Sequence, residues 1–409
     1  MLAPCPFPSH QGTQVMIRHL AEALTRVGHR VSLITYGYGE YEGSFDFPVH
    51  RALRVDAGLR SGPSLLKPAA DAALVVTALR AVQAQRCDVW HVHNVEGLAL
   101  GALLKRRTGL PLVYHAHNAM GFELPTYFRG HHIRALAGVV GDMIDRTLPK
   151  IADAVIAFDE DHRALHALCG VSPRRIHVIP PGIDGAEVTA PDAMRVQKLR
   201  TRIGKGPWLF YAGNPDAYQN LRLMWEALPG IRVARPEVRL LVASTQPAGA
   251  FAAEFEAAGA PEGVIFERYE SLDELKALFA VADIGLSPRV LWTGAPVKVL
   301  NYLAVGVPVV ACRSGARHVH TPVCGVLVDN TPEAFATGVL KLLAEPVGSR
   351  LLRQEVFEGF CMATQVPLYE EVYREVLGLR RGLGVPADSI VSTTRGPAAP
   401  KRCREESEL

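Results

Sequence analysis

The sequence contains no apolar run that approaches the roughly 20 residues needed for a transmembrane helix. Its first residues lack the basic region and the long apolar core of a secretory signal. The seven cysteines are scattered and odd in number, without a Cys-x-x-Cys pair or a Cys/His metal spacing. We therefore expect a cytoplasmic protein with reduced thiols rather than a membrane-spanning or disulfide-stabilised one.

A strong charge of either sign is also missing. The net charge is +3 with 15 histidines counted as neutral, and no Lys/Arg-rich run is interleaved with aromatic residues. We therefore expect no nucleic-acid partner. What the sequence does have is length and apolar content. Its 409 residues, of which 48% are hydrophobic, predict a globular protein of two to three domains.

Short apolar strands alternate with helices along most of the chain, which predicts parallel α/β sheets. In the first half, strands are predicted at residues 31–34, 88–94, 111–115, 154–158 and 176–179. In the second half, strands are predicted at residues 208–212, 238–243, 264–266, 284–286, 307–311 and 325–328. Met1 to Ala3 resemble the end of a first strand, which predicts that the native chain begins a few residues earlier.

This alternation predicts an α/β fold of two Rossmann-like domains in tandem. Residues 1–185 and 186–350 are the expected domains, residues 351–382 the helices that close the fold, and residues 383–409 a disordered tail. Ligands of such sheets bind at the carboxyl ends of the strands. The cleft between the two domains is therefore the expected ligand site.

Residues 283–315 predict a strand, a loop, a helix and a second strand. Gly294-Ala295-Pro296 should open the helix, because proline is tolerated in the first turn, and Gly306 should end it. The helix is expected to bury Val297, Leu300 and Ala304. Free N–H groups and the helix dipole favour an anion at such a start, and Arg289 and Lys298 flank it. These features predict a phosphate-bearing ligand; the alternative is an ordinary strand–helix turn.

Two His-x-His pairs, His91/His93 and His115/His117, each lie at the end of a predicted strand. Their spacing suggests a transition metal at first sight. No carboxylate cluster nearby completes such a site. We therefore interpret the four residues as neutral histidines in a cleft and assign no metal ligand.

Two further features allow more than one interpretation. Gly12 lies before a helix expected at residues 14–27, where a diphosphate could contact the backbone, or where glycine merely ends a loop. A local basic patch fits an acidic acceptor, peripheral association with a membrane, or plain solvation. Its members are Arg129, His131, His132 and Arg134.

Six stretches, in this order and spacing, carry a family resemblance. They are HQGTQVMIRHLAEALTRVGHRVSLIT, VYHAHN, ADAVIAFDE, IPPGID, YAGNPDAYQNL and GAPVKVLNYLAVGVPVVA. The chain to about residue 381 resembles a GT-B glycosyltransferase, and specifically the retaining family four. The resemblance implies a nucleotide-sugar donor held mainly by the second domain and an acceptor held mainly by the first. It also implies a retaining transfer that requires no metal ion or other cofactor.

The resemblance also implies roles for individual residues. In the first domain, Gly12 matches the glycine beside the donor diphosphate, and His117, followed by Asn118, matches the histidine that reaches the transferred sugar. In the second domain, four charges usual in the family are replaced by polar residues. The two glutamates of a Glu-x7-Glu pair are replaced by Thr293 and Asn301. An Arg and a Lys, expected after Gly213, are replaced by Asn214 and Gln219.

We expect Arg289 and Lys298 to supply the missing positive charge, and Asn301 to bond a ribose hydroxyl. The donor is expected to be linked to UDP or GDP, and it enters as a substrate. The acceptor could be a polysaccharide, a lipid carrier at the inner face of the membrane or a natural product; neither it nor an oligomeric state is assigned. Two alternatives remain open: a catalytically silent nucleotide-sugar-binding subunit, which the missing charges would suit, and a GT-B nucleotide-sugar epimerase.

Overall fold

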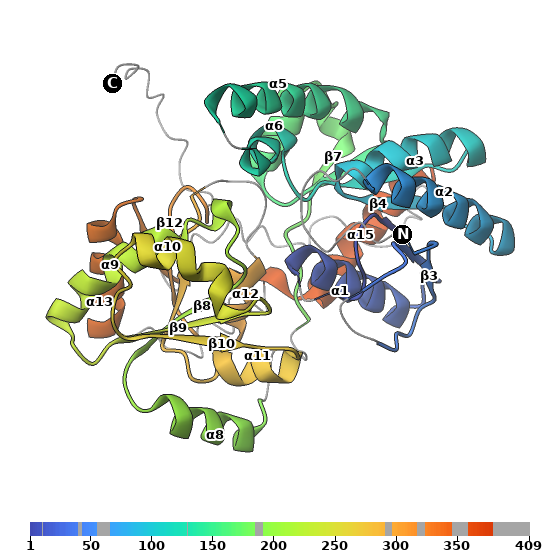
Figure 1. Cartoon of the computed structure of the whole chain (residues 1–409). Coiled ribbons are helices and arrows are strands. Elements are labelled where there is room, and N and C mark those ends of the chain that lie inside the picture. Colours follow the sequence, from blue (N-terminus) through green and yellow to red (C-terminus); the bar gives the residue numbers. More distant parts are fainter. Residues whose placement is uncertain are drawn as a thin grey trace, which may run out of the picture.

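The structure is a computed structural model, and its described part contains two parallel β-sheets, each between layers of helices (Figure 1). It describes residues 1–9, 11–39, 43–54, 66–128, 130–184, 191–290, 297–316, 324–345 and 359–378. The tail predicted at residues 383–409 lies outside this part of the chain. In Figure 1 the half built on strands β1–β7 and the half built on strands β8–β13 lie side by side.

The sheet of the first half has the strand order β3-β2-β1-β4-β5-β6-β7, with every pair parallel. Its strands are β1 (Leu2–Ala3), β2 (Leu33–Thr35), β3 (Val49–Arg51), β4 (Trp90–His93), β5 (Leu112–His115), β6 (Ala154–Ala157) and β7 (Ile176–Val178). The helices are α1 (Gly12–Arg26), α2 (Lys67–Ala84), α3 (Asn94–Thr108), α4 (Met120–Glu123), α5 (His131–Thr147) and α6 (Glu160–Leu168), with 3-10 turns η1 (Leu124–Tyr127), η2 (Leu148–Ile151) and η3 (Pro173–Arg175).

The sheet of the second half has the equivalent order β10-β9-β8-β11-β12-β13, again all parallel. Its strands are β8 (Trp208–Ala212), β9 (Arg239–Ser244), β10 (Val264–Arg268), β11 (Ile284–Ser287), β12 (Val309–Cys312) and β13 (Gly325–Val328). The helices are α8 (Ala193–Ile203), α9 (Leu221–Ala234), α10 (Ala252–Ala257), α11 (Leu272–Phe279), α12 (Val297–Ala304) and α13 (Pro332–Ala344), with 3-10 turns η4 (Ala217–Gln219) and η5 (Ala248–Phe251).

The last described helix, α15 (Met362–Val376), returns to the first half (Figure 1). Helices α2 and α3 bury their apolar residues against one face of the first sheet. Helices α1 and α15 cover the other face, where Val366 and Tyr369 of α15 join a core with Val113 of β5 and Leu20 of α1. The core of the first half is therefore built from both ends of the chain.

The two-sheet α/β architecture predicted from the sequence is confirmed, and the strand order in each half reverses beside its first strand. Strand β3 was not predicted, because its three residues, Val-His-Arg, carry no apolar alternation. The expected apolar face of α12 is partly wrong. Leu300 and Ala304 are buried in the core, whereas Val297 faces the cleft between the halves. Gly306 follows the helix with a φ of 82°, which suits glycine as a helix end.

The proposed division at residues 185 and 186 falls within 185–190, outside the described residues, and stays a prediction. Helix α8 packs on the core of the second half through Leu199 and Ile203. Within the described residues, no helix combines the length and the apolar character needed to cross a membrane.

Candidate functional site

A cavity of about 590 Å³ lies between the two halves, at the carboxyl ends of their strands. Its size suits a small-molecule ligand. The loops that follow β5, β8 and β11 all contribute to its walls. This is the edge at which doubly wound sheets bind ligands, since the strand order reverses there.

Every predicted site residue that the structure describes lines this cavity. These residues are Gly12, His117, Asn118, Gly213, Asn214, Gln219, Arg289, Lys298 and Asn301. Thr293, Gly294, Ala295 and Pro296 lie outside the described residues. The structure therefore brings these residues together at one cavity, while their place in a functional site and their roles stay predictions.

The second half of the molecule contributes one wall of the cavity, which we call the second wall and define as Gln219, Arg289, Lys298 and Asn301. Lys298 supplies a positive charge there. It lies in the first turn of α12, and its Nζ donates to Oε1 of Gln219 at 2.8 Å and to the hydroxyl of Tyr211 at 3.2 Å. The ammonium also lies 4.3 Å from the centre of the Tyr211 ring. Burial, together with the charge of Arg289, lowers the pKa of Lys298 to about 7. Lys298 therefore contacts the very residue, Gln219, that replaces the family's usual cation.

Arg289 is the second cation of this wall. It follows β11, is only 8% exposed, and lies with its guanidinium 5.2 Å from the centre of the Tyr218 ring. Burial lowers the pKa of Arg289, but an arginine remains charged in proteins. Both cations therefore line the cavity, and the substitution of charge stays a prediction.

The sequence missed the carboxylates of the cavity. Glu123, at the end of α4, lines the first wall, by which we mean His117, Asn118, Glu123 and Tyr127. Its Oε1 accepts a hydrogen bond from the Tyr127 hydroxyl. Burial raises the pKa of Glu123, while hydrogen bonds from Tyr127 and Asn118 and the charge of Arg289 oppose the shift. Asp216 of the second half also lines the cavity, and burial raises its pKa.

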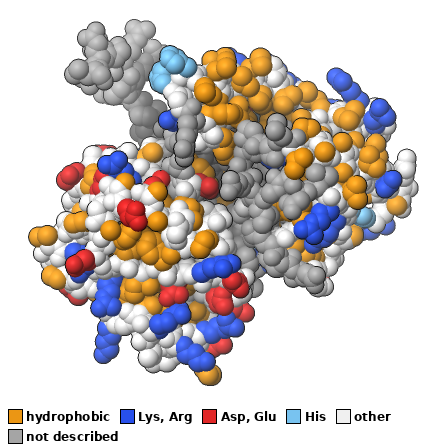
Figure 2. Space-filling view, viewed as in Figure 1, with side chains coloured by type: hydrophobic (Ala, Val, Ile, Leu, Met, Phe, Trp, Pro, Cys, Tyr) orange, Lys and Arg blue, Asp and Glu red, His pale blue; other side chains and the backbone are white. Residues whose placement is uncertain are grey.

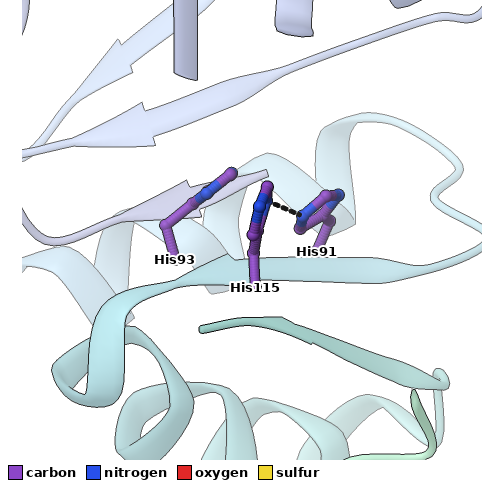
Figure 3. Close-up of side chains that lie close together, drawn as sticks. All are labelled: His91, His93 and His115. Atoms are coloured by element: carbon purple, nitrogen blue, oxygen red, sulfur yellow. Dashed lines mark hydrogen bonds between the residues drawn. The ribbon is translucent and has the colours of Figure 1, made fainter. Parts of the chain in front are cut away.

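The histidine array, by which we mean His91, His93, His115 and His117, extends from the first wall into the protein behind it. His91, His93 and His115 project from one face of β4 and β5, and Figure 3 shows these three with their rings nearly side by side. His117 follows β5 by two residues and belongs to the first wall. The exposed fractions of the four side chains are 0–3%. Nε2 of His91 lies 3.3 Å from Nδ1 of His115, and Nδ1 of His91 lies 2.6 Å from the Tyr373 hydroxyl of α15.

Burial lowers the pKa of each member of the histidine array, so the four rings are neutral at neutral pH. The neighbouring histidines add to this effect for His91, His93 and His115. Their placement in a cleft was predicted incorrectly for three of the four. Only His117 lines the cavity, while the other three are enclosed by α15 and its neighbours, which a short sequence motif does not reveal.

His91, His93 and His115 are close enough to be considered as metal ligands, with one nitrogen of each within 4.8 Å of the others. A metal must lie near the plane of every ring that binds it. Here the rings of His91 and His93 are stacked, with 16° between their planes, and the ring of His115 is tilted by 34° and 37° from them. Such stacked rings point their lone pairs in similar directions, so the array must rearrange before it could enclose an ion.

An Asp-x-Asp sequence, Asp159–Asp161, follows β6. Its first residue caps α6 by accepting a hydrogen bond from the backbone N–H of His162 at 2.7 Å. Neither aspartate is among the cavity-lining residues described. The Asp-x-Asp motif therefore has a local structural role, in which Asp159 caps α6.

Two family models match the chain in succession. Residues 10–187 match the model described as Glycosyltransferase Family 4. Residues 206–345 match the model described as Glycosyl transferases group 1. Each match corresponds closely to one of the two sheets and its helices.

Curated relatives have related descriptions. The chain is 26% identical to an MMP alpha-(1->4)-mannosyltransferase of Mycolicibacterium hassiacum, over 90% of this chain and 97% of that protein. It is 29% identical to a D-inositol 3-phosphate glycosyltransferase of Xylanimonas cellulosilytica, over 82% and 84%. A similar match, 27% identical, to the enzyme of that name from Segniliparus rotundus spans 64% of this chain and only 60% of that protein.

Solved structures share the fold. A sucrose-phosphate synthase from Thermosynechococcus elongatus aligns with a TM-score of 0.76 at 17% identity, over 93% of this chain and 99% of that one. Anabaena HepE, solved in complex with UDP-glucose, aligns with a TM-score of 0.68 at 15% identity, over 92% and 99%. At these identities the likeness concerns the fold alone.

Proposed function

The chain belongs to the group 1 glycosyltransferases of the GT-B fold, and from this premise we propose that it is a retaining enzyme that moves a sugar from a nucleotide-sugar donor to an acceptor hydroxyl. One observation carries the proposal. Two cations, buried Arg289 and half-buried Lys298, lie on one wall of the cavity, and uncharged His117 and Asn118 lie on the other. The diphosphate belongs beside the cations and the sugar beside the histidine.

The proposed reaction needs charge stabilisation more than a base. The bond between the anomeric carbon and the diphosphate oxygen breaks, and negative charge grows on the leaving diphosphate. Fixed cations at that position stabilise the transition state more than the ground state. The acceptor oxygen bonds to the same face of the anomeric carbon, and its proton passes to the leaving phosphate oxygen. Arg289, Lys298 and the start of α12 would stabilise the leaving group in this scheme.

We expect nucleotide binding to need no divalent metal, because these two cations already face the cavity. Calorimetry with UDP and GDP in excess EDTA measures this directly. Affinity that disappears on chelation and returns with Mg²⁺ would remove the metal-free proposal.

A thermal-shift screen of nucleoside diphosphates tests the donor class, since a bound ligand raises the melting temperature by mass action. UDP-glucose is the first donor to examine, because HepE was solved with it. Sugar transfer or donor hydrolysis by the purified protein supports an enzyme. Nucleotide binding without either reaction would favour the silent binding subunit instead, and conversion of the donor into an isomeric nucleotide sugar would favour the epimerase.

For the acceptor we propose a lipid-linked hydroxyl, reached from the cytoplasmic face of a membrane. Helix α5 presents four exposed apolar side chains on one face (Figure 2). They are Ile133 (55% exposed), Leu136 (64%), Val139 (66%) and Met143 (58%). His131, His132 and Arg134 lie at the start of the same helix and suit anionic headgroups. The helix packs on η1, which carries the Tyr127 of the first wall, so a bilayer there would lie near the cavity.

Vesicle co-sedimentation tests this surface. Leu136→Glu with Val139→Glu should abolish binding to vesicles that contain anionic phospholipid. Val233→Glu is the matched control, because Val233 is 87% exposed on α9 of the other half. Equal binding by all three proteins, or none by the parent, would point to a water-soluble acceptor.

A further inference from the structure

His93 lies one layer behind the cavity and contacts the residue that reaches it. Nδ1 of His93 lies 3.0 Å from Nε2 of His117. The two side chains are 0% and 3% exposed, and of the two only His117 lines the cavity. The hydrogen bond between them is therefore shielded from solvent, and its direction affects what His117 can offer to a ligand.

The other nitrogen of His93 indicates which ring donates. Nε2 of His93 is buried and has no hydrogen-bond partner among the described residues. If His117 donated from Nε2, then His93 would carry its own proton on Nε2, as a buried N–H without an acceptor. If His93 donates from Nδ1, its Nε2 is left as a bare acceptor. Unpartnered buried donors are the rarer of these two defects in proteins.

A neutral imidazole carries one proton, so the direction of this bond determines the tautomer of His117. With Nε2 of His117 accepting, the proton must lie on Nδ1. We propose that His93 is a positioning residue that holds His117 as the Nδ1–H tautomer, so that His117 donates a hydrogen bond to a hydroxyl oxygen of the transferred sugar. This inference rests on the proposed function, since it takes the sugar as the ligand of His117.

His93 should affect the tautomer of His117 and not the position or the charge of its ring, because other surroundings of His117 determine those two properties. The His117 ring is stacked on His115 at 4.7 Å and lies edge-on to Phe158 at 5.4 Å. These two contacts hold the ring without His93. Burial lowers the pKa of His117 to about 3, so the ring stays neutral at working pH.

The test compares two substitutions at His93 with one control. His93→Asn keeps an N–H donor near the position of Nδ1, whereas His93→Leu removes every donor. His91→Leu is the control, because it removes another buried imidazole of the array whose hydrogen bonds go to Tyr373 and His115 rather than to His117.

Nitrogen chemical shifts of ¹⁵N-histidine-labelled protein report the tautomer without any donor present. We expect Nδ1–H on His117 in the parent, in His93→Asn and in His91→Leu, and loss of that preference in His93→Leu. An Nε2–H signal from His117 in the parent would overturn the assignment. An unchanged His117 tautomer in folded His93→Leu would overturn it as well. The measurement on the parent remains decisive even if His93→Leu fails to fold.

Kinetics separate positioning from stability. In His93→Leu we expect kcat for sugar transfer to fall about tenfold, the low end for residues that orient a functional group, with little change in nucleotide affinity. His93→Asn should recover most of that loss, and a purely structural role would not predict this recovery. A parent protein with the Nδ1–H tautomer that transfers no sugar to any acceptor would overturn the proposed function and the sugar contact, but not the pairing of His93 with His117.

Discussion

The two walls of the cavity come from sheets of equivalent topology, yet they present opposite chemistry. The first wall is backed by the neutral histidine array, and the second contains Arg289 and Lys298. Burial disfavours the charged form of both kinds of side chain. Histidine can then be neutral at pH 7, whereas arginine keeps its charge. The fold therefore determines where a ligand lies, and the response of each side chain to burial determines which part of the ligand it meets.

Acid should remove the difference between the two walls, because it favours protonation of the buried histidine array in the first half. Burial lowers the pKa of the four histidines of the array in the folded protein, whereas unfolded histidine titrates near 6.5. Below that pH the unfolded chain binds more protons, so the free energy of unfolding falls as the pH falls.

Each histidine that stays neutral in the folded protein lowers the free energy of unfolding by about 1.4 kcal/mol for each pH unit below 6.5. Several such histidines together remove a substantial part of a total stability of about 5–15 kcal/mol for a typical domain. Circular dichroism during a titration from pH 7.5 to 5 should show unfolding. Replacing His91 and His115 together with leucine should move the midpoint to lower pH, and an unchanged midpoint would contradict the explanation.

His117→Ala tests the chemistry of the first wall. If His117 contacts the transferred sugar, turnover should fall about a hundredfold, as for other lost transition-state donors. Affinity for the nucleoside diphosphate should change little, because the phosphates lie at the other wall. His29→Ala, at an exposed histidine that does not line the cavity, is the control. A lower melting temperature with unchanged activity per folded molecule would mean that His117 is only structural.

Removing a cation tests the second wall. Arg289→Ala and Lys298→Ala should each weaken nucleoside diphosphate binding about tenfold or more, since a hydrogen bond to a charged group contributes about 1.5–3 kcal/mol. Binding of the bare nucleoside should hardly change. Arg313→Ala is a suitable control, because the Arg313 side chain is 65% exposed in the same half. If both variants bind like the parent, the phosphates are held by other groups.

Lys298 should also make nucleotide binding depend on pH. Its pKa in the ligand-free protein is lowered to about 7, chiefly by burial. Only the protonated form attracts the diphosphate, so affinity should fall by roughly fivefold between pH 7 and 8.5. This fall is smaller than the loss of about tenfold expected for Lys298→Ala, because Lys298 is already partly neutral at pH 7. Binding at pH 8 should therefore take up protons, which calorimetry in buffers of different ionisation enthalpy detects. The affinity of Lys298→Arg should not change with pH across this range, because arginine stays protonated. If its affinity declines as that of the parent does, a group other than Lys298 causes the pH dependence.

Much of the fold, and part of the cavity lining, could be predicted from local patterns. Apolar strands followed by small or polar residues locate the carboxyl ends of a parallel sheet, which is how Gly12 and Arg289 were found. Gln219 and Asn301 of the second wall followed from the family resemblance instead. Glu123 and Tyr127 could not be found from local patterns. They belong to short helical turns within a long amphipathic segment, and only packing against α5 turns them toward the cavity.

The depth of the histidine array was equally hidden. His-x-His spacing places both side chains on one face of a strand, but it does not reveal what covers that face. The cover includes Tyr373 of α15, which is 282 positions from His91 in the sequence. No local pattern contains that contact, so only the assembled fold shows that three of the four rings are enclosed.

The return of α15 to the first half has a consequence for anyone who wishes to produce the halves separately. A fragment that ends near residue 184 would lack Met362, Val366 and Tyr369, and would expose the apolar face that they cover. A fragment that starts near residue 191 would carry the same helix with nothing to pack it against. A soluble first half should therefore require residues 1–184 joined by a flexible linker to residues 359–378, and an expression trial of the second half should stop near residue 345.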